Sequence, residues 1–99
     1  MVCVANWPAA RGDAFTSLLK ARAIENQCYV IGVNRVGIDG TGLIYSGDSR
    51  VIGPKGEMIE SSQSNTTDYK IAKLSMNELN DFRIKFPVLD DADNYKLML

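Results

Sequence analysis

The feature that most constrains the fold is an uncharged run at residues 28–33 (CYVIGV). Apolar residues occupy both alternating sets of positions in this run, whereas a strand with one solvated face alternates between apolar and polar residues. The run therefore predicts a β-strand that is buried on both faces. Such a strand needs a packed layer on each side of its sheet, and a chain of 99 residues has little material from which to build both.

A helix is predicted over residues 13–27, directly before this strand. The residues on one of its faces follow spacings of three and four, but two of them are polar. This face consists of Phe15, Leu18, Leu19, Arg22, Ala23 and Asn26. A buried arginine must be paired, and Glu25 lies three residues from Arg22. The pattern leaves open whether the two form a structural ion pair or whether these polar groups line a cavity.

The other elements follow from apolar runs and turn residues. Residues 1–7 predict a short buried strand, residues 49–52 and 57–61 a hairpin around the GPKG turn, and residues 68–74 a further strand. Ser75 and Glu78 form a capping box that opens a helix, and Pro87 ends it. The tail at residues 88–99 either is loose or packs its apolar residues on a partner, and its spacing favours neither.

This order of elements predicts a mixed α/β architecture, with helices covering one face of a mixed sheet. Residues 1–99 show no internal domain boundary. Because two helices cannot easily cover both faces of the sheet, we expect the second layer to come from sequence upstream of residue 1 or from a partner chain. The isolated chain is expected to self-associate, since uncovered apolar sheet surface attracts a partner.

Composition excludes several classes of function. The absence of histidine excludes Ser-His and Cys-His nucleophile pairs and every histidine metal site. A net charge of −1 provides no general attraction to nucleic acid or anionic lipid. No apolar run approaches the roughly 18 residues that a membrane span needs, and no secretion signal is present, so we expect a cytoplasmic protein. Cys3 and Cys28 lie in apolar runs and are expected in the core, and no metal or cofactor is predicted.

Two polar residues, Asn34 and Arg35, follow the central strand directly. The ends of central strands are where α/β folds usually place their binding sites. The alternative is that these residues begin a solvated loop, because three glycines follow within seven residues. The pattern does not separate the two interpretations.

Four ordered segments resemble the carbon–nitrogen hydrolase (nitrilase) superfamily. They are residues 4–11 (VANWPAAR), 21–27 (ARAIENQ), 32–37 (GVNRVG) and 45–49 (YSGDS). Within the superfamily the chain looks most like the omega-amidases, which hydrolyse the side-chain amide of 2-oxoglutaramate and similar 2-oxo acid amides. The resemblance covers essentially the whole chain. It implies the C-terminal part of a four-layer α-β-β-α sandwich, well under half of that domain.

The resemblance also implies where the chemistry lies. The family uses a cysteine nucleophile, a glutamate general base, a lysine that stabilises the oxyanion, and a second glutamate. All four precede the part of the family domain that this chain resembles. Neither Cys3 nor Cys28 fits the nucleophile motif, so no catalytic residue is expected within these 99 residues.

By resemblance, Asn6 and Trp7 end their strand beside the active-site cleft, and Asn34 and Arg35 end the next strand nearby. We predict these four as substrate-binding residues. Arg35 is the expected partner of a substrate carboxylate, because a guanidinium binds such an anion through paired hydrogen bonds.

Two main hypotheses follow. The first is an amidase acting on a small carboxylated amide, represented here by its C-terminal piece. The second is a non-catalytic remnant that acts as a binding or oligomer-interface module, and a stand-alone α/β domain is a third. The partners expected are a small amide substrate in the complete enzyme, and either another copy of the chain or the missing N-terminal part.

Overall fold

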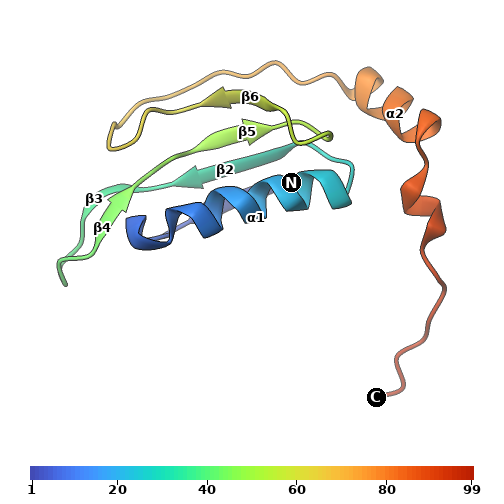
Figure 1. The fold of residues 1–99 in the computed structure, drawn as a ribbon, viewed down its shortest axis with the longest axis horizontal. Helices are drawn as coiled ribbons and strands as arrows, with labels where there is room; N and C mark the ends of the chain where they lie inside the picture. The colour runs from blue at the N-terminus through green and yellow to red at the C-terminus, as the bar shows by residue number, and fades with distance from the viewer.

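The computed structural model describes residues 1–99 (Figure 1). Its elements follow the predicted order, except that residues 36–46 form an additional hairpin and residues 68–74 form no strand. Two short 3-10 helices, at Ala9–Arg11 and Val88–Asp91, accompany two α-helices and six strands. The larger elements are β1 (Val2–Ala5), α1 (Gly12–Glu25), β2 (Val30–Asn34), β3 (Val36–Ile38), β4 (Ile44–Ser46), β5 (Arg50–Ile52), β6 (Met58–Ser61) and α2 (Met76–Lys85).

Four of the strands form a mixed sheet in the order β1-β2-β5-β6. β1 and β2 are parallel, and β5 and β6 continue the sheet antiparallel to their neighbours. Because α1 connects the two parallel strands, β1, α1 and β2 form a crossover unit of the kind that parallel pairing requires. The predicted α/β class with a mixed sheet is confirmed.

The core lies between this sheet and α1. Phe15, Leu19 and Ala23 lie on successive turns of the helix and pack against Val30 of β2 and Ile52 of β5. The helix approaches β2 closely, because Gly32 has no side chain there. A Cβ atom at Gly32 would lie 2.3 Å from Cδ1 of Leu19.

The expectation that the central strand is buried on both faces is wrong for this chain. Val30 and Gly32 are buried under α1, but Val33 on the opposite face is 44% exposed. The pairing of β1 with β2 sets Val2 beside Ile31 and Val4 beside Val33. Val2 and Val4 are 65% and 82% exposed, so β1 is not the buried strand that its sequence predicts. The apolar pattern is present, but no second layer covers this face.

The polar residues predicted on the buried face of α1 are exposed in the structure. Nε of Arg22 lies 2.7 Å from a carboxylate oxygen of Glu25, but about half of each side chain is exposed. Asn26 is exposed as well. The pair is therefore a surface ion pair of small energetic value, neither a buried bridge nor a cavity wall.

The hairpin and the second helix form as predicted. Glycine at position 56 adopts φ +83°, and its N–H donates to the carbonyl of Gly53 to close the β5–β6 turn. Oγ of Ser75 accepts from the Glu78 N–H at 3.2 Å, which caps α2. Reciprocal hydrogen bonds between Ser75 and the hydroxyl of Tyr29 hold this cap against the start of β2.

The predicted strand at residues 68–74 is wrong for the isolated chain. Residues 66–74, which we call the strap, belong to no strand and have no backbone–backbone hydrogen bond within 68–74. Tyr69 and Ile71 are 86% and 85% exposed. The strand pattern is present, but a strand exists only where a neighbour receives its N–H and C=O groups, and the chain provides none here.

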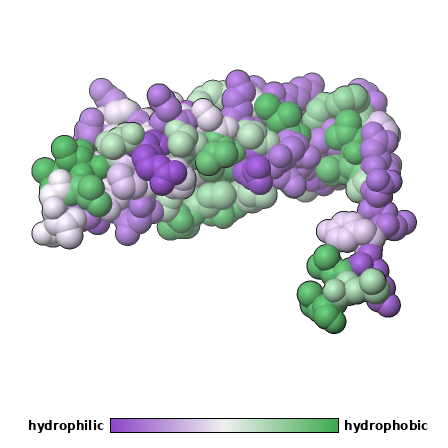
Figure 2. Space-filling view, turned by 60° about the horizontal axis from the view of Figure 1, so that its bottom comes forward, coloured by the Kyte–Doolittle hydropathy of each residue, from purple (hydrophilic) through white to green (hydrophobic).

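The C-terminal tail leaves the body of the molecule after α2. Figure 2 shows it projecting from one end of a slab, with hydrophobic residues at its tip, while further hydrophobic side chains gather at the opposite end, where β3 and β4 lie. Leu97 in the tail is 72% exposed. Neither helix combines the length and apolar character that crossing a membrane requires.

Candidate functional site

The ends of the two parallel strands bring together the polar residues singled out in the sequence. Ala5 of β1 pairs with Asn34 of β2, so Asn6 and Trp7 emerge beside Asn34 and Arg35. Parallel strands end on the same edge of a sheet, and this juxtaposition follows directly from the β1-α1-β2 connection. The four residues therefore form one neighbourhood, although they have different surroundings within it.

Asn34 connects three segments through its side-chain amide. Its Oδ1 accepts from the backbone N–H of Trp7 at 2.8 Å, and its Nδ2 donates to the carbonyls of Trp7 at 2.9 Å and Gly47 at 3.0 Å. The backbone N–H of Asn34 also donates to Oγ of Ser49 at 2.9 Å. Asn34 thus fixes the end of β1 and the start of the segment before β5 relative to β2.

Trp7 turns toward α1. Its indole N–H donates to the carbonyl of Arg11 at 2.6 Å, and its ring lies 5.7 Å from that of Phe15 in the core. The guanidinium of Arg11 lies 5.0 Å from the indole centroid, on the outer side of the same contact. Asn6 is exposed and has no side-chain hydrogen bond.

Arg35 is exposed, and its guanidinium lies 4.6 Å from the centroid of the Tyr45 ring. The ion pairs of the chain are Arg22 with Glu25 and Lys70 with Asp68, so no carboxylate neutralises Arg35. A cation above an aromatic face keeps its in-plane N–H donors directed outward. The contact with Tyr45 therefore orients the guanidinium of Arg35, and no carboxylate of the chain occupies its N–H donors. These donors can bind an anion.

Tyr45 lies on β4, in a hairpin that the sequence pattern did not predict. β3 and β4 pair around a loop in which Asp39 accepts four hydrogen bonds, from the N–H and hydroxyl of Thr41, the N–H of Leu43 and the hydroxyl of Tyr45. The hydrogen bonds from Thr41 are the main reason that the pKa of Asp39 falls from 3.8 to about 2. The bond to Asp39 in turn raises the pKa of Tyr45 above its ordinary value. The sequence feature that could have indicated this hairpin is Asp39 followed by Gly40, a pair typical of tight turns. From the sequence pattern alone, we considered these residues only as part of a solvated loop.

The loop that holds Tyr45 should respond to pH only in strong acid. Because the pKa of Asp39 is lower in the folded than in the unfolded chain, its contribution to stability is complete above the ordinary value of 3.8 and is lost as the pH falls toward about 2. NMR titration should show the amide signals of Thr41 and Leu43 moving with a midpoint near 2. In Asp39→Asn these shifts should be absent. A midpoint at the ordinary carboxyl value would contradict the hydrogen bonds described.

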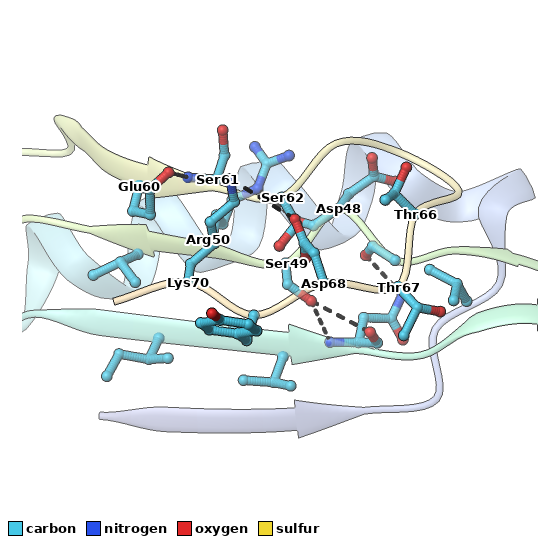
Figure 3. Close-up of a pocket in the computed structure, with 18 of the residues that line it drawn as sticks. Asp48, Ser49, Arg50, Glu60, Ser61, Ser62, Thr66, Thr67, Asp68 and Lys70 are labelled. Carbon is cyan, nitrogen blue, oxygen red and sulfur yellow. Dashed lines mark hydrogen bonds and ion pairs between the residues drawn. The ribbon is translucent and has the colours of Figure 1, made fainter. Parts of the chain in front are cut away.

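A cavity of about 420 Å³ lies between the sheet and the strap, on the face opposite α1 (Figure 3). β2, β5 and β6 form its floor, and residues 66–70 pass in front of it. Asn34 and Arg35 line this cavity, whereas Asn6 and Trp7 do not. The structure thus separates the two pairs of predicted site residues: Asn34 and Arg35 lie on the cavity, whereas Trp7 packs toward α1 and Asn6 is exposed away from the cavity lining.

Asp48 anchors the loop that leads into the strap through Ser64, and the sequence interpretation assigned it no role. Its carboxylate accepts hydrogen bonds from the hydroxyls of Ser46 and Ser64. Partial burial alone would raise the pKa of Asp48, but these bonds and the nearby charge of Arg50 outweigh it, and the pKa lies below its ordinary value. The only signal in the sequence was that Asp48 lies within the YSGDS segment.

The cysteines and acidic residues form no reactive cluster. Cys3 and Cys28 are free thiols that pack against the core around α1, and neither sulfur takes part in a side-chain hydrogen bond. No group of three cysteine, aspartate or glutamate side chains is placed to hold a metal ion. These residues form a polar surface beside the cavity, with the guanidinium of Arg35 held on Tyr45. They do not form a pair of nucleophile and general base.

Comparison with known proteins places this surface in a family. The carbon–nitrogen hydrolase profile matches residues 6–84. The chain is 53% identical over 94 residues to the Escherichia coli omega-amidase YafV, covering 95% of this chain and 37% of that protein. It is 33% identical to the 2-oxoglutaramate amidase of Paenarthrobacter nicotinovorans over 90 residues, covering 91% of this chain and 30% of that protein.

The fold agrees with a solved structure. The chain superposes with a TM-score of 0.90 on a CN-hydrolase superfamily protein from Xanthomonas campestris, at 40% identity, covering 98% of this chain and 37% of that one. The chain therefore spans between 30% and 37% of the length of these relatives. The matched residues include all four predicted site positions and the YSGDS segment. The chain belongs to the carbon–nitrogen hydrolase family.

Proposed function

We propose that this chain is the C-terminal portion of an amidase that hydrolyses a small carboxylated amide, such as the amide of a 2-oxo acid. The observation that carries the proposal is the unpaired guanidinium of Arg35, which is stacked on Tyr45 at the ends of the parallel strands. The relatives named omega-amidase and 2-oxoglutaramate amidase support this substrate class. A substrate of this class carries a carboxylate that needs a cationic partner.

The reaction proposed is nucleophilic amide hydrolysis by the cysteine, glutamate and lysine of the family. A thiolate attacks the amide carbonyl, ammonia leaves with a proton from the glutamate, and water then cleaves the thioester. We place these groups outside residues 1–99. Cys3 and Cys28 support this placement, because both pack against the core and have no carboxylate or ammonium partner.

Within this proposal the four predicted site residues have different tasks. Arg35 binds the substrate carboxylate, and Tyr45 and Asp39 hold its guanidinium in place through the stacking contact and the 3.0 Å hydrogen bond between them. Asn34 and Trp7 position the strand ends through their mutual hydrogen bonds. Asn6, exposed beside them, extends the polar surface toward the substrate.

A second candidate function is a non-catalytic binding or interface module. The observation in its favour is the uncovered apolar face of the sheet, where Val4 is 82% exposed. Large exposed apolar patches mark interaction sites in soluble proteins. Activity measurements separate this candidate from the first one.

A chimeric enzyme tests the amidase proposal. Residues 1–99 replace the matching C-terminal segment of the E. coli omega-amidase, and turnover of 2-oxoglutaramate is measured by ammonia release. We expect the chimera to be active and the 99-residue chain alone to be inactive. An inactive but folded chimera favours the interface module, and turnover by the chain alone would contradict the placement of the nucleophile outside it.

Arg35→Ala in the active chimera is expected to raise KM about tenfold with little change in kcat, since one exposed charge-assisted contact to the substrate is lost. Arg22→Ala is the matched control, because Arg22 is also an exposed arginine but lies in the surface ion pair of α1. Equal KM values for the two variants would remove Arg35 from the substrate site.

A further inference from the structure

Two short connections join the β3–β4 hairpin to the four-stranded sheet. The first is Arg35, the single residue between the end of β2 at Asn34 and the start of β3 at Val36. The second is the segment 47–49 between β4 and β5, which we call the 47–49 turn. The hairpin forms a two-stranded sheet of its own, and Figure 1 shows it at one end of the main sheet. The angle between the two sheets is therefore set at these connections.

This angle decides whether Arg35 meets Tyr45. Arg35 lies in the first connection, whereas Tyr45 lies within β4, and the guanidinium is 4.6 Å from the ring centroid. The hydrogen bond from Tyr45 to Asp39 holds the ring only within the hairpin, because Asp39 lies between β3 and β4. β4 also packs against the 3-10 helix at Ala9–Arg11, but no hydrogen bond joins the two. The directional contacts that hold the hairpin must therefore lie at its base.

The 47–49 turn packs closely against the strand ends. Gly47 and Asp48 have φ values of +77° and +59°, and a left-handed φ is uncommon for a residue with a Cβ such as Asp48. A Cβ at Gly47 would lie 2.7 Å from Cγ1 of Val36, so the turn lies directly on the start of β3. The carbonyl of Gly47 accepts from the amide of Asn34 at 3.0 Å. An uncommon backbone conformation persists where the surrounding contacts determine it, and Asp48 supplies further contacts of this kind.

The carboxylate of Asp48 joins three segments at the base of the hairpin. One oxygen accepts from the hydroxyl of Ser46, the last residue of β4, at 2.5 Å, and the other accepts from the hydroxyl of Ser64. The N–H of Asn65 donates to the carbonyl of Ser46 at 2.8 Å and reinforces this link. The oxygen that accepts from Ser46 also lies 4.0 Å from the position of a Cβ at Gly12, the first residue of α1. Asp48 therefore connects the end of β4 with the loop before the strap, beside the start of α1.

We propose that Asp48 is a positioning residue, which fixes the hairpin at the angle that places the Tyr45 ring against the guanidinium of Arg35. Asp48 has no hydrogen bond or ion pair with either residue, so it acts through Ser46. Side chains of adjacent strand residues point to opposite faces, so holding the Ser46 hydroxyl on one face of β4 directs the Tyr45 ring to the other. The consequence for substrate binding rests on the proposed function, in which Arg35 binds the carboxylate.

The NMR signals of Arg35 in the 99-residue chain test this positioning without any measurement of activity. Protons of a guanidinium group that lies against an aromatic ring are shifted upfield by the ring current. This shift should be largely lost in Ser46→Ala, which removes the donor to Asp48. It should also be largely lost in Asp48→Gly, because glycine keeps the left-handed φ without strain but has no carboxylate.

Ser61→Ala is the matched control. Ser61 also ends a strand, β6, but its hydroxyl makes no hydrogen bond, so the Arg35 signals should match those of the wild-type chain. Full retention of the upfield shift in Ser46→Ala and Asp48→Gly would overturn the proposal. Its loss in Ser61→Ala would do the same, because the contact would then respond to any change at a strand end.

Substrate binding by the active chimera provides the second readout. Asp48→Gly should raise KM about fivefold with little change in kcat, but less than about twofold in an Arg35→Ala background, where no guanidinium remains to be positioned. An equal rise in both backgrounds would overturn the proposal, because Asp48 would then act on the fold and not through Arg35. If the NMR signals change as expected while Arg35→Ala and Asp48→Gly both leave KM unaltered, the positioning by Asp48 stands and the proposed role of Arg35 is wrong.

Discussion

Replacing Asn34 by leucine is expected to lower the free energy of unfolding of the chain by about 3 kcal/mol. Leucine has a similar size but no hydrogen-bonding group. The substitution therefore leaves the N–H of Trp7 and the carbonyls of Trp7 and Gly47 without their partner. Each such group costs roughly 1 kcal/mol or more when it is shielded from water, and the region is partly buried.

Urea unfolding of wild type and variant at equal protein concentration measures this effect. Asn6→Leu is the matched control: Asn6 is the same residue type at the end of the neighbouring strand, but it is exposed and has no side-chain hydrogen bond. Its unfolding free energy should change by less than about 0.5 kcal/mol. Similar losses in the two variants would show that the amide of Asn34 does not hold the strand ends together.

Gly32→Ala is expected to lower the free energy of unfolding by about 2 kcal/mol, although the change adds only one methyl group. The added Cβ would lie 2.3 Å from Cδ1 of Leu19. Leu19 is 5% exposed and packed among the core residues, so its side chain can move away only by displacing a neighbour. Either α1 or the neighbours of Leu19 must therefore shift, which loosens the contacts of the core.

Two further variants isolate this cause. Gly40→Ala adds the same methyl group where nothing lies within 4 Å, and its unfolding free energy should stay near that of wild type. In a Leu19→Ala background the atoms that would clash are absent, so Gly32→Ala should cost little there. Additive losses in the double variant would place the penalty in the backbone of β2 rather than in the contact with α1.

The sequence was sufficient for features that depend on residues a few positions apart. The Ser75 cap, the turn closed by Gly56, and the helical face that carries Phe15, Leu19 and Ala23 all formed as predicted. Each depends on local backbone geometry and on spacing within one element. The family resemblance had the same basis, since it was carried by short ordered segments.

Features that depend on distant partners were the ones that the pattern misplaced. The strap has a strand-like sequence but no neighbouring strand, and the valines of β1 have a core-like sequence but no covering layer. Arg22 and Glu25 were expected either as a structural ion pair or as part of a cavity wall, and they form a half-exposed ion pair on the surface of α1. In each case the residue types indicated whether the segment favours a strand or a buried position. Whether it forms a strand or is buried depends on whether another part of the chain packs against it.

The candidate site divides in the same way. The sequence indicated that polar residues at the ends of two strands form a neighbourhood, and the parallel pairing of β1 with β2 brings them together. Only the tertiary structure decided that Asn34 bonds internally to Trp7 while Arg35 remains available above Tyr45. The contact with Tyr45 spans the β3–β4 hairpin, which no periodic pattern predicted.

By itself, the sequence determined the α/β class and the approximate positions of β1, α1, β2, the β5–β6 hairpin and α2. These follow from hydrophobic periodicity and turn chemistry, which act within a few residues. The tertiary structure decided which face of the sheet stays open, which polar groups satisfy one another and which cation remains unpaired. Such outcomes depend on whether a group from elsewhere in the chain reaches a given point in space, and spacing along the sequence does not encode that.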